Sequence, residues 1–177
     1  NFEGSTSQAI VIHMPESGCL RVLGSRWGDE FTYARQSGYL LKAIPLSNPD
    51  LILANEGKTA TLPFLSEPEH SWCYYHAKAE LARQENNWQR VIDLLEEATS
   101  LGYEANDPFE WLVFIEADAM MGNLESAKKR SADAMEWDGG VRKGLCQVWK
   151  RVQAHDPERG DIMPQVEQVL ANFQCPP

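Results

Sequence analysis

The stretch that decides the fold runs from Ser71 to Trp137 and holds two similar segments, SWCYYHAKAELARQENNWQRVIDLLEEATSLGY (71–103) and DPFEWLVFIEADAMMGNLESAKKRSADAMEW (107–137). When the stretch is laid over itself with a shift of 36 residues, Trp88 falls on Leu124, Val91 on Ala127 and Ala98 on Ala134. In each segment, apolar residues recur three and four positions apart on both sides of a short polar break, which is typical of two amphipathic helices joined by a turn. The sequence therefore predicts two consecutive helical hairpins.

Capping and turn residues set the expected ends of these helices. Asn86-Asn87 should end a first helix over 71–85, because Asn tolerates the left-handed conformation found at helix ends, and Gly102 should stop a second helix over 88–101. Asp107-Pro108 is a cap followed by Pro at the first helical position, and it should start a third helix. Further breaks are expected at Gly122-Asn123 and Gly139-Gly140. The face of the first helix that we expect to point inward carries Tyr74, Ala77, Lys78 and Leu81.

The regions on either side of the hairpins complete the predicted fold. Residues 9–12 (AIVI) and 20–23 (LRVL) are mainly apolar, include β-branched side chains and flank a Pro-Glu-Ser-Gly turn, so they predict two adjacent strands. Periodicity is weak over 24–69, apart from a short helix or strand at 37–44 that should end before Pro45. Apolar spacing predicts a fifth and a sixth helix after residue 140. The expected fold is mainly α, with degenerate helical hairpins and capping helices over 71–177 and a small strand-containing appendage over 1–70.

Composition bears on which partners the chain can have. The formal net charge is −10 and the isoelectric point is about 4.8, which disfavours nucleic acid and anionic membrane surfaces, since both attract Lys and Arg. No apolar run reaches the ~18–20 residues that span a bilayer. The chain opens on a polar stretch, NFEGSTSQ, as a domain cut from a longer protein would.

The four cysteines, Cys19, Cys73, Cys146 and Cys175, show no CxxC spacing that would indicate a structural zinc site. They permit three disulfide pairings or buried free thiols, and the cellular compartment follows from that choice. A bridge between Cys146 and Cys175 would tie down the carboxy-terminal segment.

Candidate catalytic and metal sites are weak. His70, Cys73 and His76 are three residues apart, and Cys73 with His76 could pair a nucleophile with a base, but no oxyanion hole or further ligand is recognisable. Glu116 and Asp118, like the Lys128-Lys129-Arg130 run, are interpreted as solvated helix surface. We therefore expect no catalytic residues, no metal and no cofactor.

The two hairpins resemble tetratricopeptide repeats, in which an aromatic residue stands early in the first helix and a small residue lies near fixed points of the second. Tyr75 and Trp111 match the first position, and Ala98 and Ala134 match the second. The spacing of 36 exceeds the usual ~34 residues, and the small residue of the first helix, Ala79, becomes Ile115 in the second copy, so the repeats would be degenerate. Such repeats bind partners on the side that their first helices line. This implies a shallow binding groove formed by His76, Glu80, Arg83 and Glu116.

A second resemblance covers more of the chain. The segments HSWCYYHAKAELARQENNWQRV, FIEADAMMGNLESA and LCQVW resemble the carboxy-terminal extracytoplasmic region of bacterial multi-pass membrane proteins related to family 39-like (dolichyl-phosphate-mannose type) glycosyltransferases. The GCLRVL and IPLSNPDLI segments are similar to the linker side of that region. The resemblance implies that glycosyltransferase chemistry would belong to a membrane portion outside this chain.

Together these observations predict a non-catalytic interaction or scaffold module on the extracytoplasmic side of a bacterial membrane. Its partner would be a protein or peptide, with a glycan as an alternative, and its contact with the membrane would come only through the missing portion. Two other readings stay open: an independent soluble cytoplasmic adaptor, and a small hydrolase that uses Cys73 and His76.

Overall fold

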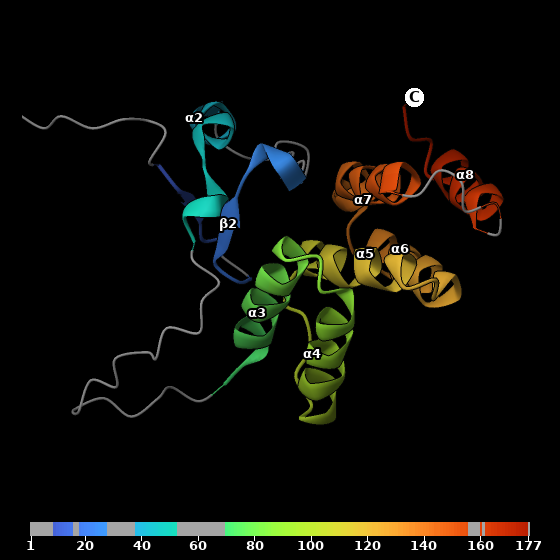
Figure 1. Cartoon of the computed structure of the whole chain (residues 1–177), viewed down its shortest axis with the longest axis horizontal. Helices are drawn as coiled ribbons and strands as arrows, with labels where there is room; N and C mark the ends of the chain where they lie inside the picture. The colour runs from blue at the N-terminus through green and yellow to red at the C-terminus, as the bar shows by residue number, and fades with distance from the viewer. Residues whose placement is uncertain are drawn as a thin grey trace, which may run out of the picture.

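The computed structural model describes residues 9–15, 18–27, 38–52, 70–155, 160 and 162–176 (Figure 1). It is mainly helical, with packed helical hairpins and a small amino-terminal antiparallel sheet, as the sequence predicts. The sheet lies beside α3, with α2 on the far side of the sheet, and the carboxy-terminal helices α7 and α8 lie on α5 and α6 (Figure 1).

The first two helical hairpins have the predicted spacing. Helix α3 (Trp72–Gln84) is followed by α4 (Trp88–Ser100). The next pair is the 3-10 turn η5 (Pro108–Trp111) with α5 (Leu112–Met120), followed by α6 (Leu124–Trp137). Elements of the second pair begin 36 residues after those of the first, and the aligned residues Val91, Ala98, Ala127 and Ala134 are all buried. The predicted self-similarity therefore corresponds to equivalent packing positions.

Local chemistry explains where these helices end. Asn86, Gly102 and Gly122 all have a positive φ, so the backbone is left-handed at each predicted break. The Asn87 side chain accepts a hydrogen bond from the backbone N–H of Arg90 and caps α4. Asp107 likewise accepts from the N–H of Phe109, but the turn that it starts is 3-10 rather than the first turn of an α-helix.

Helix α5 lies at the centre of the helical region. Every residue from Leu112 to Ala119 is buried, because α5 contacts α3, α4, α6 and α7. Its side chains contribute to two apolar clusters, one shared with α3 and α4 and the other with α6, α7 and α8. Both ionisable residues of the helix, Glu116 and Asp118, are consequently inside the protein.

The carboxy-terminal helices close the second cluster. The short η6 (Gly139–Val141) leads into α7 (Arg142–His155), and α8 (Met163–Asn172) lies against α7. Cys146 of α7 forms a disulfide with Cys175 after α8, which is the pairing expected for tying down the end of the chain. No helix among the described residues is long and apolar enough to cross a membrane.

The amino-terminal appendage is built on a hairpin of β1 (Val11–His13) and β2 (Arg21–Leu23), in which Ile12 pairs with Val22. The 3-10 turns η2 (Ser25–Trp27), η3 (Ile44–Leu46) and η4 (Pro49–Leu51) and the helix α2 (Gly38–Ala43) complete it. The segment at 37–44 is thus helical where it is described, and Pro45 continues it as a 3-10 turn instead of ending it. Leu23 and Ile44 form the small core of the appendage.

Two features at Cys19 join the appendage to the helices. Cys19, just before β2, forms a disulfide with Cys73 of α3. The buried carboxylate of Glu110 accepts hydrogen bonds from the backbone N–H of Cys19 (2.6 Å) and from Nε1 of Trp72 (2.7 Å). A covalent bond and a buried polar contact therefore hold the start of β2 against the start of α3.

The predicted inward face of α3 is wrong. Ala77 and Lys78 are exposed, whereas Tyr75, Ala79 and Ala82 are buried against α4 and α5. The buried side also carries His76 and Arg83, so it is less apolar than the sequence pattern requires of an inner face. Apolar spacing does not identify the buried face of α3, because that face also carries polar residues.

Candidate binding site between the hairpin and helix α3

The four residues predicted to bind a partner, His76, Glu80, Arg83 and Glu116, lie together in one cluster of charges. Glu116 of α5 is only 1% exposed and accepts two hydrogen bonds from Arg151 of α7, with both N–O distances at 2.7 Å. Nη1 of Arg83 lies 3.6 Å from the same carboxylate. Glu116 therefore joins α3, α5 and α7 through a two-pronged ion pair, the strongest geometry for an Arg–carboxylate contact.

Glu80 extends this cluster to the β1–β2 hairpin. Its carboxylate forms ion pairs with Arg83 on the next turn of α3 and with Arg21 of β2, whose Nη2 lies 3.4 Å away. Burial raises the pKa of Glu80, but the guanidiniums of Arg83 and Arg21 outweigh burial, so the net direction is below its ordinary value. Glu80 is therefore ionised at neutral pH and holds two cations at the junction.

His76 lies at the inner end of the cluster and is fully buried. Neither ring nitrogen has a hydrogen-bond partner among the described residues, and Nε2 lies 3.7 Å from Oε1 of Glu80. Burial lowers the pKa of His76 to about 4; Glu80 opposes this shift, and Arg21 and Arg83 reinforce it. The imidazole is consequently neutral at physiological pH.

The sequence interpretation of Glu116 and Asp118 as solvated charges is wrong. Both carboxylates are buried, and Nε of Arg130 donates to Asp118 at 2.9 Å. Burial raises the pKa of Asp118, and Arg130 offsets only part of that effect. In the basic run, Lys129 is exposed as predicted, but Arg130 is committed to this buried partner. Charge on a helix did not indicate exposure here, because each carboxylate has an Arg from another helix.

The predicted groove is not formed as expected. The four residues are brought together, but Arg83 and Glu116 are buried as an ion pair, His76 is buried as a neutral ring, and none of the three lines an open concave surface. Only Glu80 keeps an appreciable exposed fraction, 21% of its side chain. Of these four residues, Glu80 is therefore the one that a ligand can contact directly.

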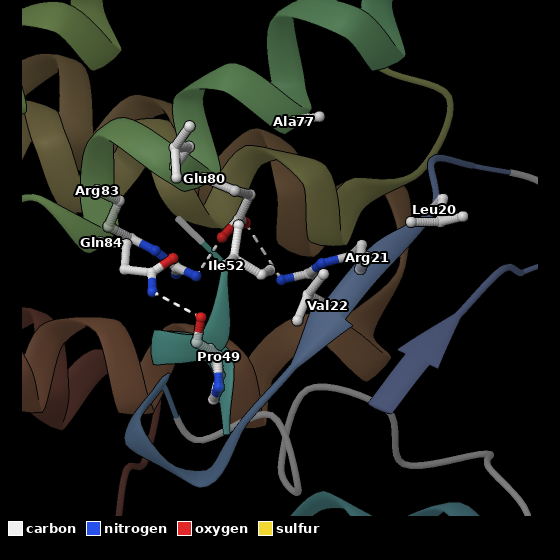
Figure 2. A pocket seen from close by; sticks show the side chains of 10 residues that line it. Leu20, Arg21, Val22, Pro49, Ile52, Ala77, Glu80, Arg83 and Gln84 are labelled. Atoms are coloured by element: carbon white, nitrogen blue, oxygen red, sulfur yellow. Dashed lines mark hydrogen bonds and ion pairs between the residues drawn. The ribbon is translucent and has the colours of Figure 1, made fainter. Parts of the chain in front are cut away.

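A pocket of about 190 Å³ opens on that side, between β2 and α3 (Figure 2). Its polar lining consists of Arg21, Glu80, Arg83 and Gln84, and its apolar lining consists of Leu20, Val22, Pro49, Ile52, Ala77 and Leu81. Ala77 and Leu81 belong to the stripe of α3 that was expected to face the helices. The stripe instead forms one wall of the pocket.

Sequence reasoning missed every pocket residue that comes from the appendage. Leu20, Arg21 and Val22 were identified as part of a strand, and Pro49 and Ile52 only as part of the IPLSNPDLI segment. Their approach to α3 depends on the Cys19–Cys73 disulfide, on the Arg21–Glu80 pair and on a hydrogen bond from the Gln84 amide to the Pro49 carbonyl (3.1 Å). No sequence pattern connects these segments with α3, so their contact could not be predicted from the sequence.

The proposed nucleophile at Cys73 is wrong for the oxidised protein, because its sulfur is bonded to Cys19 and has no thiolate to offer. The same bond rules Cys73 out as a metal ligand beside His70 and His76. Among the described residues, the one close group of metal-type ligands is Cys19, Cys73 and Glu110, and its two sulfurs are joined to each other. His70 stacks on the ring of Tyr74 instead.

Acidification should destabilise the protein through His76. The unfolded imidazole binds a proton below pH 6.5, whereas the buried one resists protonation until about pH 4, so the free energy of unfolding falls across that window by about 3 kcal/mol. His76→Phe should flatten this dependence when urea unfolding is followed from pH 7 to pH 4. The variant must be compared with the wild type, because other groups also change the free energy of unfolding as the pH falls. Glu80, whose pKa is lowered, adds to the loss of stability, whereas Asp107 and Asp118, whose pKa values are raised, oppose it.

The matched control is His155→Gln, at the exposed end of α7. It should leave the pH dependence of the wild type unchanged. Parallel pH profiles for the wild type and His76→Phe would contradict the assignment of this dependence to His76.

Comparison of the chain with protein-family models, with curated proteins and with solved structures finds no match.

Proposed function

We propose that this chain is a non-catalytic protein-interaction module that works on the extracytoplasmic side of a membrane as part of a longer membrane protein. The observation that carries the proposal is the pocket between β2 and α3, in which aliphatic side chains surround one partly exposed carboxylate. The charged residues behind it form ion pairs between helices, which is a structural use of those groups. Of the residues at this site, those in the pocket wall are therefore the ones that a partner would contact.

The compartment is supported by the cysteines. All four form disulfides, Cys19–Cys73 and Cys146–Cys175, and such bonds suggest an oxidising, extracytoplasmic compartment. Mass spectrometry of alkylated protein from the native host, with and without reductant, should show four cysteines protected until reduction. Four alkylated cysteines without reductant would favour the cytoplasmic adaptor instead.

The membrane tether and the degenerate tetratricopeptide character enter this proposal through the sequence resemblances and the 36-residue spacing. Between the two kinds of partner, the pocket favours a peptide over a glycan. Among the described residues, the ten that line it are aliphatic or polar and include no aromatic ring, whereas a sugar face is commonly held against one. A peptide side chain fits such a lining through ordinary apolar burial.

Photocrosslinking in the native host tests the interaction role. The crosslinking residue p-benzoylphenylalanine would replace Ala77 at the pocket, Asp133 on α6 or Glu167 on α8, one site at a time in the full-length protein. We expect a discrete protein adduct from at least one site, and from Ala77 if the pocket is the contact. Adducts absent from all three sites would contradict the proposed function.

A further inference from the structure

The pocket continues onto an apolar face of the β1–β2 hairpin. Side chains two residues apart in a strand share a face, and so do directly paired residues, which puts Ile10, Ile12 and Met14 on the same side as Val22 and Leu20. Met14 is 74% exposed, and Ile12 and Leu20 are more than half exposed. The opposite face, with Val11 and Leu23, packs on Leu40 and Ile44. One side of this sheet is thus the appendage core, and the other is an apolar surface that none of the described segments covers and that leads into the pocket.

Helix α3 supplies the facing wall. Ala77 and Leu81 lie one turn apart on its outer side, and Gln84 follows below them. Figure 2 shows side chains from β2, from Pro49 and Ile52, and from α3 converging on one space. The volume, about 190 Å³, is below the ~300–1,000 Å³ of sites for drug-sized ligands. It suits one anchoring side chain, with the rest of the ligand lying over the hairpin face.

The charges at this site restrict the ligand further. The side chains of Arg21 and Arg83 are each only 4% exposed, so the ionised group that a ligand meets is the carboxylate of Glu80. A carboxylate oxygen accepts hydrogen bonds and cannot donate them when ionised, so the ligand must present an N–H or O–H there. Backbone N–H groups beside an anchoring residue meet this requirement.

Charge outside the pocket favours a basic ligand. Glu85 follows Gln84 at the end of α3 and is exposed. Asp50 follows Pro49 with 73% of its side chain exposed, and the nearby Arg26, 3.8 Å away and 56% exposed, balances part of its charge. The whole chain carries a net charge of −10, which attracts cations over a Debye length of about 10 Å at 0.1 M salt. Lys or Arg beside the anchor would lie over this acidic rim, away from the two covered guanidiniums.

We propose that the groove between the hairpin and α3 binds an extended peptide that places one aliphatic side chain in the pocket, donates a backbone N–H to Glu80 and carries Lys or Arg next to the anchor. The proposal rests on the proposed interaction function and names its binding site and ligand class. Leu, Ile, Val and Met are the anchors that the aliphatic lining accepts.

Peptide display tests this directly. A library of random heptapeptides displayed on phage would be selected against the oxidised full chain at 0.1 M salt. We expect enriched sequences to share an aliphatic residue flanked by Lys or Arg. A synthetic peptide of that consensus should bind at least tenfold more weakly when its anchor is changed to Ala or its basic residues to Glu.

A variant at the pocket and a matched variant elsewhere locate the binding. Ala77→Phe adds a ring at an exposed pocket position and should reduce binding of the consensus peptide at least tenfold without unfolding the protein, as checked by circular dichroism. Ala171→Phe makes the same change at an exposed position of α8 and should leave binding unchanged. Selection of no consensus, a consensus without an aliphatic anchor or without basic residues, or equal binding by both variants would overturn the proposal.

The two tests fail separately. A native crosslink from Asp133 or Glu167 together with no peptide consensus would keep the interaction function and remove this site. A pocket-dependent consensus together with no native crosslink would keep the site and remove the proposed cellular role.

Discussion

Glu116→Gln should lower the free energy of unfolding by about 3–5 kcal/mol, the usual effect of removing one member of a buried ion pair. The carboxylate is almost completely covered, and it is bound to Arg151 and lies near Arg83. Neutralising it leaves guanidinium charge inside the protein without its partner, which costs far more than one lost hydrogen bond. Urea unfolding at pH 7, with both disulfides intact, measures the difference.

Glu125→Gln is the matched control for this change. Glu125 also pairs with a cation, Lys128 at 2.9 Å, but its side chain is 90% exposed. Exposed pairs contribute little because water already solvates both charges, so this variant should stay within about 0.5 kcal/mol of the wild type. If the two variants were equally stable, the buried pair between α5 and α7 would not exist as described.

Trp149→Ala should destabilise the protein by a similar amount, about 3–5 kcal/mol, for an apolar reason. Trp149 of α7 is fully buried in the cluster formed with α5, α6 and α8, and its Nε1 donates to Oγ of Ser131 at 3.1 Å. Truncation removes a large buried surface and leaves a cavity that helices tied by the Cys146–Cys175 disulfide cannot easily close. Thermal and urea unfolding should both report the loss.

Trp137→Ala serves as the comparison, since Trp137 ends α6 with 51% of its surface exposed. Its effect should remain below about 1 kcal/mol, as for most surface substitutions. A Trp149→Ala protein no less stable than Trp137→Ala would show that α7 does not pack as the structure places it.

Both effects depend on α5, the helix on which the packing converges. Glu116 connects it to α3 and α7 by charge, and Leu112, Ile115 and Ala119 connect it to α7 and α8 by apolar contact. Because Arg83 belongs to both the Glu116 and the Glu80 pairs, this core reaches the pocket between β2 and α3. A rigid lining is what a small anchoring pocket needs, since a preorganised site loses less entropy on binding.

Much of the helical architecture was predictable from local sequence. The Asn86-Asn87, Asp107-Pro108 and Gly122 signals act through the conformation and hydrogen bonds of a few adjacent residues, so the predicted ends of α3 to α6 lie within a few residues of the observed ones. The same holds for the two strands. The Cys146–Cys175 bridge was one of several pairings that the sequence left open, and the structure shows it. The four candidate residues also came together, because spacing on a helix indicates which side chains share a side.

Errors arose where a side chain's partner is distant in the chain. Glu116 was interpreted as solvated because Arg151, 35 residues later, gives no local sign that it will be opposite. The outer stripe of α3 was taken for the inner face because Ala77 and Leu81 are apolar, although they line a pocket whose other wall begins at Leu20. Apolar spacing predicts that a helix face contacts other parts of the protein, but it does not identify which parts.

The sequence by itself determined the helical hairpins, their ends and the side of α3 and α5 that carries the candidate residues, since propensity, capping and periodicity act over a few residues. The tertiary structure alone decided which of those residues are buried, which disulfide joins Cys19 to Cys73, and that a pocket exists between β2 and α3. The physical reason is that burial of a charge and closure of a pocket both require groups from separate segments. Arg21 and Glu80, 59 residues apart, acquire their shared role only when the folded chain brings them into contact.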